Sequence, residues 1–336
     1  MTNKLSHSVI DAFLKRPGAG AVVFTLLLII VFSVQTGGTW ISHANMTSVL
    51  QVTSTLGIMA LGQALVITSR EIDISVGSVF GFGALTYLGV AESIGVVPAA
   101  IVAVAAGSAI GLLNGFLVTR LKVPSLIATL GTLFIFRGLC IALTEGFSFY
   151  ASSEIRDSTF FALLGGSEVF GFNDAIVWLL AFTAILHLAI FLTPFGNRLL
   201  ALGGDAKSAF SRGVRVQGMK CLVFVLCSTL AAFAGVLEAS KIGFADGSFG
   251  RLQELEAIAA CVIGGCLMTG GRCSVIGVVL GAFLLSGIQS FLVLNGVQPQ
   301  WFLILLGLLV VGALIGDQSL RRRILRRRIA SGSTKK

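Results

Sequence analysis

Three stretches of this 336-residue sequence place ionisable side chains between long apolar runs. The first is Arg70 to Gly77 (REIDISVG), with Arg70, Glu71 and Asp73. Charged groups at membrane depth cost at least ~2.5 kcal/mol and are usually paired, or face a cavity or another helix. The stretch predicts an Arg–carboxylate cluster that fixes a helix start, with Asp73 and Ser75 satisfying free N–H groups. The alternative is that these groups line or gate a solute path.

The second stretch is Asn114 to Gly138 (NGFLVTRLKVPSLIATLGTLFIFRG), where Asn114 and Thr129 are further polar candidates for the path. Pro124 suits a sharp re-entry into a helix, because proline is tolerated in a first turn. Arg137 is the only basic residue deep in an apolar run. A structural ion pair and a substrate contact both stay open for it, and the sequence names no partner.

The third stretch is Glu254 to Gly271 (ELEAIAACVIGGCLMTGG), which has Glu254 and Glu256 at one end and the pair Gly264 and Gly265 further on. Paired glycines permit a break in a helix, and helix ends inside a membrane can meet polar groups of a substrate. Close packing of helices explains the same glycines equally well.

Residues for covalent or metal chemistry are missing from the pattern. The six cysteines form no CxxC pair, and the three histidines are scattered. The fragment Gly203 to Ser208 has Ala206 where a phosphate-binding loop requires glycine. We therefore expect no catalytic residue, no metal and no cofactor bound by this chain, and an enzyme is not predicted.

Composition indicates an all-helical polytopic membrane protein. Hydrophobic residues make up 55% of the chain and charged residues 12%, and the mean hydropathy is +0.96. The net charge of +9 comes from basic residues in loops and tails, which is how membrane topology is encoded, so nucleic acid is not expected as a partner.

The apolar runs predict about ten membrane-spanning helices, because a span needs about 20 such residues. They are expected near residues 19–36, 48–69, 76–92, 97–119, 125–144, 175–193, 219–238, 255–269, 274–294 and 300–316. The third and the eighth are short, so either one is a candidate for a broken or re-entrant helix. A permease domain at 19–316 then lies between an N-terminal segment, 1–18, and a basic tail, 317–336.

The distribution of charge favours an even number of spans with both termini in the cytoplasm. Of the 24 lysines and arginines, this arrangement leaves only Arg156, Lys241 and Arg251 outside, with Arg137 inside a helix. The outer loop, 145–174, carries mostly acids, and its glycines and phenylalanines suggest short ordered pieces. It is either a solvated loop or a docking surface for an extracytoplasmic partner.

Glycines four residues apart predict close helix packing, because they place bare backbone on one helix face. The pattern occurs as Gly107, Gly111 and Gly115, and again as Gly77 with Gly81 and Gly277 with Gly281.

A polar interruption at 194–218 (PFGNRLLALGGDAKSAFSRGVRVQG) separates the two halves of the apolar sequence. Its cations are Arg198, Lys207, Arg212 and Arg215, against the single acid Asp205. The segment must leave the membrane and face a partner, and we expect a short helix near Asp205 to Ser211.

In their order along the chain, these stretches resemble the permease subunits of bacterial ABC importers for monosaccharides, the family of the ribose, xylose and arabinose permeases. REIDISVG resembles EIDLSVG of that family, and similar matches cover about residues 45–316. Five positions of segment 194–218 match the family's ATPase-docking loop, while Asp205, Ser208 and Arg212 depart from it. The matching positions are Gly196, Gly203, Gly204, Ala209 and Gly213.

The resemblance implies an inner-membrane pore of two permease chains, a periplasmic sugar-binding protein and a separate ATPase subunit that uses ATP. The expected function is import of a monosaccharide or polyol. An ion-coupled secondary transporter is the main alternative, although that class usually keeps an ionisable group near mid-membrane and only Arg137 is predicted there. A structural membrane subunit without its own path is a second alternative.

Overall fold

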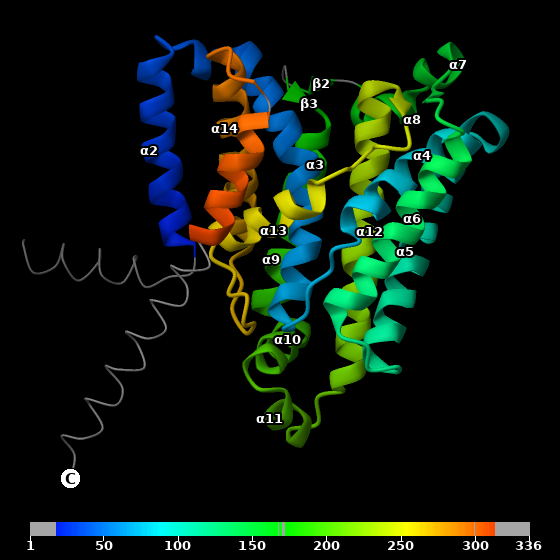
Figure 1. Cartoon of the computed structure of the whole chain (residues 1–336), viewed down its shortest axis with the longest axis vertical. Coiled ribbons are helices and arrows are strands. Elements are labelled where there is room, and N and C mark those ends of the chain that lie inside the picture. The colour runs from blue at the N-terminus through cyan, green and yellow to red at the C-terminus, as the bar shows by residue number, and fades with distance from the viewer. Residues whose placement is uncertain (1–17, 167, 170–171, 299, 313–336) are drawn as a thin grey trace, which may run out of the picture.

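The computed structural model describes residues 18–166, 168–169, 172–298 and 300–312, and within them the chain is almost entirely helical (Figure 1). Most of the predicted N-terminal segment and all of the predicted tail at 317–336 lie outside the described residues. Strands in the described residues are two-residue pieces: β1 (Phe149–Tyr150) pairs with β4 (Phe244–Ala245), and β2 (Glu168–Val169) with β3 (Phe172–Asn173). The predicted all-helical class is confirmed.

Six of the described helices are long and apolar enough to cross a membrane. They are α3 (His43–Thr68), α5 (Val96–Thr119), α6 (Ser125–Thr144), α9 (Ala175–Leu192), α12 (Val216–Ile242) and α14 (Val275–Leu294). Shorter apolar helices lie at α2 (Ala19–Gln35) and at residues 300–312. This is the build of a multi-pass membrane protein.

The remaining helices are α4 (Val76–Ile94) and several short ones. The short ones are η1 (Thr39–Ile41), α7 (Ser153–Arg156), α8 (Thr159–Phe161), η2 (Ala162–Gly166), α10 (Pro194–Gly204), α11 (Ala206–Ser211) and α13 (Gln253–Ile263). With 11 residues, α13 reaches about 16 Å, roughly half of the hydrocarbon core. The full span predicted at 255–269 is therefore wrong, and the broken-helix alternative holds.

Helix α12 lies in the middle of the bundle and packs against α3, α4 and α5 (Figure 1). The glycines of α5 make this approach possible: a Cβ at Gly111 would lie 2.6 Å from the Phe224 carbonyl oxygen, and one at Gly107 would lie 2.3 Å from the Ala232 side chain. Gly281 faces α13 in the same way, 2.1 Å from the Ala260 oxygen. The predicted packing role of these glycines is confirmed.

The bundle has two different ends, at the bottom and top of Figure 1. Helices α10 and α11 form the lower one, which we call the α11 end. Strands β2 and β3 and helices α7 and α8 lie at the opposite one, which we call the strand end. The predicted outer loop, 145–174, thus contains the short ordered elements expected of it.

Candidate functional site

A non-helical segment, residues 69–75, separates α3 from α4 inside the bundle. Its backbone is satisfied by side chains of α6: the Ile72 N–H donates to Ser125 Oγ at 3.3 Å, and the Ile74 N–H donates to Thr129 Oγ1 at 3.1 Å. Irregular backbone at membrane depth is tolerated only where protein groups replace water in this way. The side chains of α6 therefore stabilise this irregular backbone inside the bundle.

Asp73 is fully buried in this segment and begins a chain of polar side chains. Its Oδ1 accepts from the Ser75 N–H at 2.8 Å and from the Ser75 hydroxyl at 2.6 Å. Asn114 of α5 donates to Ser75 Oγ at 2.8 Å, and Thr132 of α6 donates to Asn114 Oδ1, also at 2.8 Å. We call Asp73, Ser75, Asn114 and Thr132 the buried polar network. Four predicted residues, including Thr129, thus come together from three parts of the sequence.

Sequence reasoning missed Ser125 and Thr132, although a signal was present. With Thr129 they recur at intervals of four and three residues, which places all three on one face of α6. It also missed Gln63 of α3, whose Oε1 accepts from the Cys227 thiol at 3.6 Å. Within the described residues, the buried Gln63 Nε2 and Asp73 Oδ2 have no hydrogen-bond partner. These two buried polar atoms are thus available to a bound solute, whereas the other side chains of the network already bond to one another.

The first turns of α4 and α13 meet where Glu254 is buried. A Cβ at Gly77 would lie 2.0 Å from Glu254 Oε2 and 2.6 Å from the Gly250 oxygen, and one at Gly81 would lie 2.3 Å from the Phe249 oxygen. Figure 1 shows α13 partway along the bundle, beside α3 and α14. The predicted close approach at the glycine pair of α4 is confirmed, and the backbone that approaches is residues 249–250, just before α13. Helix N-termini carry partial positive charge, which favours a carboxylate at this place.

Arg137 of α6 reaches the same place and donates to the Phe249 carbonyl oxygen. Glu254 lies close to it, because a Cβ at Gly81 would lie 3.5 Å from Arg137 Nη1 and Gly77, one turn earlier, faces Glu254. The Phe249 ring stacks on Phe80 with centroids 5.6 Å apart. The contact that holds Arg137 is thus a backbone carbonyl, with the carboxylate of Glu254 nearby, and the ion pair and the substrate contact both stay predictions.

The other predicted residues in and just after α13 lie apart from Glu254. Glu256 lies two residues beyond Glu254, about 200° around the helix. Gly264 is buried against α14, where a Cβ would lie 2.5 Å from the Gly277 oxygen, so packing explains it. Gly265 has φ of +89° just after the end of the helix, so the helix break explains it.

Segment 194–218, the predicted coupling loop, folds as α10 and α11. The Thr193 hydroxyl caps α10, and Asp205 caps α11 by accepting from the Lys207 N–H at 3.0 Å and from the Ser208 hydroxyl at 2.8 Å. Hydrogen bonds from Ser208 and Lys207 lower the pKa of Asp205 below its usual value. The predicted short helix near residues 205–211 is confirmed.

The coupling loop has a buried side and an exposed side. Its buried residues include Gly196, Gly203 and Ala209, and a Cβ at Gly203 would lie 1.9 Å from the Thr68 oxygen. The exposed ones include Arg198, Gly204, Asp205, Arg212, Gly213 and Arg215.

A hollow of about 740 Å³ lies beside α11 and is lined by Arg120, Lys207 and Arg215. Phe210, 71% exposed, also lines it; it is a large apolar residue in an otherwise small, polar helix, a signal that sequence reasoning passed over. The loop therefore offers a basic surface with one apolar side chain.

The charges at the start of segment 69–75 do not form the predicted Arg–carboxylate cluster. Arg70 donates from Nε to the Gly203 oxygen at 2.6 Å and from Nη2 to the Gly204 oxygen. Glu71 instead pairs with Lys220 of α12. The cluster prediction is wrong because the last carbonyls of α10 lack partners within their own helix and approach Arg70 more closely than either acid does.

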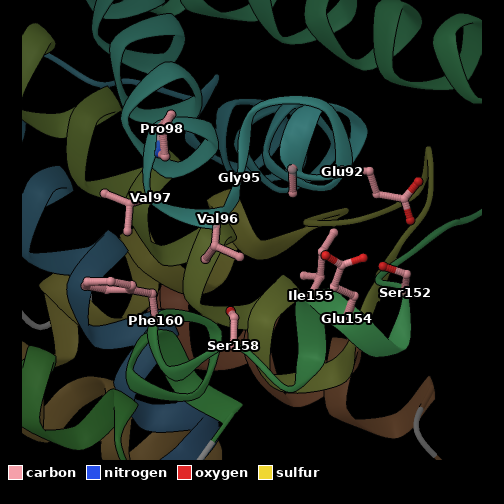
Figure 2. Close-up of a pocket in the computed structure, with 11 residues that line it drawn as sticks. Glu92, Gly95, Val96, Val97, Pro98, Ser152, Glu154, Ile155, Ser158 and Phe160 are labelled. Carbon is pink, nitrogen blue, oxygen red and sulfur yellow. The ribbon is translucent and has the colours of Figure 1, made fainter.

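The strand end carries a second hollow, of about 680 Å³, between the α4–α5 turn and helices α7 and α8. Figure 2 shows the carboxylates of Glu92 and Glu154 beside it, with Val96, Val97 and Phe160 around it. The end of the molecule opposite to the basic loop therefore presents an acidic hollow.

A further ionisable pair lies near the C-terminal end of α12. Glu238 accepts from the Thr55 hydroxyl at 3.0 Å and pairs with Lys241 at 3.3 Å. Asp73 and Glu254 add two buried carboxyl groups. The absence of interior ionisable groups therefore no longer argues against an ion-coupled transporter.

Helices that break inside a membrane bundle around buried polar groups are the build of a solute transporter. A family model described as the permease component of branched-chain amino acid transport systems matches residues 45–314. The chain belongs to this permease family, which is one of transport proteins and not of enzymes. The predicted resemblance to importer permeases is thereby confirmed.

Similar proteins of known name are also permeases of import systems. The autoinducer 2 import system permease protein LsrC of Yersinia pseudotuberculosis serotype IB (strain PB1/+) is 33% identical over 312 residues, covering 92% of this chain and 87% of the relative. LsrC of Yersinia pestis (strain Pestoides F) is 33% identical over 315 residues with the same coverage. No solved structure matches the chain.

Proposed function

We propose that this chain is the permease of an ATP-driven importer that moves a monosaccharide or related polyol across the bacterial inner membrane. The observation that carries the proposal is the direct contact between an exposed basic loop and the segment that leads into the buried polar network. A surface that an ATPase could move is thereby joined to groups that could meet a solute. Similarity to autoinducer 2 import permeases over most of the chain supports the same function.

The proposed topology has ten crossings with both termini in the cytoplasm. The six long helices, the two shorter apolar ones and α4 give nine crossings, and α13 together with the non-helical residues around it gives the tenth. An even number places both ends of the chain on the side of the coupling loop, where most basic residues lie. The strand end then faces the periplasm. Accessibility of Ser153→Cys from outside intact cells, with Ser211→Cys reached only after permeabilisation, is the expected labelling pattern.

Three protein partners are proposed. An ATPase subunit docks on the coupling loop, with the Phe210 ring entering its surface and Arg212 and Arg215 pairing with acidic residues. A periplasmic sugar-binding protein docks at the strand end, over the hollow beside Glu92 and Glu154 (Figure 2). A second permease chain completes the pore. ATP belongs to the ATPase, and this chain binds no cofactor.

The substrate class rests on the polar network and on the relatives. Hydroxyl and amide groups, such as those of Ser75, Asn114 and Thr132, suit a solute rich in hydroxyl groups because each both donates and accepts. The family description names branched-chain amino acids instead, so that class is the second candidate.

A pull-down of the tagged chain from native membranes in mild detergent, with mass spectrometry of the co-purifying proteins, tests the partners. An ATPase subunit and a binding protein are expected. Uptake of labelled ribose, xylose, arabinose, autoinducer 2 and leucine by cells that express the whole system then identifies the substrate class. Uptake that survives loss of the ATPase and collapses with an uncoupler would contradict the proposal and support an ion-coupled transporter.

A further inference from the structure

Two neighbouring charged residues bind segment 69–75 to both ends of the loop that contains α11. Arg70 donates to the carbonyl oxygens of Gly203 and Gly204, at the end of α10. Glu71 pairs with Lys220, near the start of α12. Because α10 precedes α11 in the chain and α12 follows it, a displacement of α11 acts on the segment from two sides.

Arg70 is held in an unusual backbone conformation at this place. Its φ is +68°, in the left-handed region that favours glycine. A Cβ at Gly270 would lie 2.4 Å from Arg70 Cγ, and the Gly271 N–H donates to the Thr68 oxygen at 3.0 Å. Strained residues persist where the surrounding structure fixes them, and they gather at sites that switch or bind. The end of α10 and the α13–α14 loop thus hold Arg70 together.

The segment leads from these charges directly to the buried polar network. Only residues 71–74 separate Arg70 from Ser75, and the N–H groups of Ile72 and Ile74 are tied to hydroxyls of α6. The next bond is the one from Ser75 to Asp73, which continues to Asn114. Between the coupling loop and the interior there is no slack linker that could absorb a movement.

We propose that Arg70 and Glu71 are positioning residues that transmit movement of the coupling loop to the buried polar network. The inference rests on the proposed function, because an ATPase must move the loop. When α11 shifts, the end of α10 and Lys220 move with it, and Arg70 and Glu71 carry segment 69–75 along. The bonds from this segment to α6 then rearrange, and Ser75 changes its position against Asn114.

One residue allows this to be tested without disturbing the backbone. Arg70→Gly removes both hydrogen bonds to α10, while glycine accepts the positive φ more readily than arginine does. Arg70→Lys retains the charge but lacks the planar fork that reaches two carbonyls. Arg272→Ala is the matched control, since Arg272 is an exposed arginine at the same end.

The experiment is hydrogen exchange with mass spectrometry on the complex of the permease with its ATPase, compared with and without ATP plus vanadate. In the unmodified complex and in Arg272→Ala, the nucleotide is expected to change exchange in peptides over both 194–213 and 69–78. In Arg70→Gly the change over 69–78 is lost while that over 194–213 remains, and Arg70→Lys restores part of it.

Three outcomes have separate meanings. A change over 69–78 that persists in Arg70→Gly would overturn the inference and leave the proposed function standing. Loss of both changes in Arg70→Gly, with the ATPase still bound, would assign Arg70 a local structural role and overturn the inference as well. Failure of an ATPase to co-purify with the unmodified chain would overturn the proposed function, and this inference with it.

Discussion

The coupling loop and the buried polar network are two polar regions of this molecule, and they are built in opposite ways. The loop carries exposed cations, which are the groups proposed to meet the ATPase. The network consists of buried side chains that bond to one another across three elements. A charged group is stable where water surrounds it and is destabilising where it is buried, so the network uses hydroxyl and amide groups around one carboxylate, Asp73.

The two regions therefore have different roles, one in the binding of a partner and the other in the arrangement of the helices. Exposed cations set how fast a partner binds and which partner is chosen. Groups that are already bonded inside the bundle fix one arrangement of helices, and a change of partners there is a change of conformation. The contacts of Arg70 and Glu71 are where the two regions meet.

The largest effect is expected from a change in the bundle that contains the network. Gly111→Leu forces a side chain against the Phe224 carbonyl oxygen of α12, and overpacking of this kind costs about 3 kcal/mol. We expect loss of folded protein in size-exclusion chromatography. Gly131→Leu on α6 is the control, because nothing lies within 4 Å of a Cβ there. A normal elution profile for Gly111→Leu would show that α5 and α12 can separate without harm.

Reversal of two charges in the loop is expected to leave the bundle intact. Arg212→Glu with Arg215→Glu replaces two exposed cations of the proposed docking surface. Binding of the ATPase should weaken roughly tenfold or more, since each exposed ion pair contributes up to ~1 kcal/mol. Co-purification of the ATPase measures it, with Lys122→Glu as a control at the same end. Unchanged recovery of the ATPase would remove the loop from the interface.

The network can be weakened without a change of shape. Thr132→Val removes the donor to Asn114 Oδ1 and leaves a buried acceptor unpaired, at a cost of about 1–2 kcal/mol. A lower melting temperature of the purified protein is expected. In the control, Thr183→Val, the lost hydroxyl donates to the Leu179 oxygen of its own helix. Equal melting temperatures for the two variants would mean that the network adds nothing to the stability of the bundle.

The contact between the two regions is expected to tolerate a swap of charges. Glu71→Lys and Lys220→Glu each place like charges together, while the double variant restores the pair. A partly exposed pair of this kind contributes about 1 kcal/mol. Uptake by cells should fall in each single variant and return in the double one. A double variant as inactive as the singles would show that the side chains act separately.

The smallest effect is expected at Asp205, which caps α11 in water. Its pKa is lowered in the folded protein, so its contribution to α11 is present above the pKa of the unfolded chain and is lost as the pH falls through the folded value. Hydrogen exchange over residues 206–212 should therefore rise in Asp205→Ala, and should rise in the native chain only at acidic pH. Identical exchange in the two chains at neutral pH would contradict the capping role.

Much of this molecule follows from its sequence alone. Long apolar runs with basic loops determined an all-helical membrane bundle, because a spanning chain must satisfy its own backbone. The spacing of Gly107, Gly111 and Gly115 determined a close helix contact. The short helix near Asp205 to Ser211 was also predicted, and its cap, Asp205, makes only local hydrogen bonds.

Only the tertiary structure decided which groups meet. Asp73 and Asn114 lie 41 positions apart, and nothing in either stretch names the other. Arg70 was expected to pair with a nearby acid, yet the folding of α10 brings two carbonyl groups to it from more than 130 positions away. The helices themselves form from local periodicity, whereas the partners of a buried polar group depend on which distant backbone or side chain the packed bundle brings within hydrogen-bond distance.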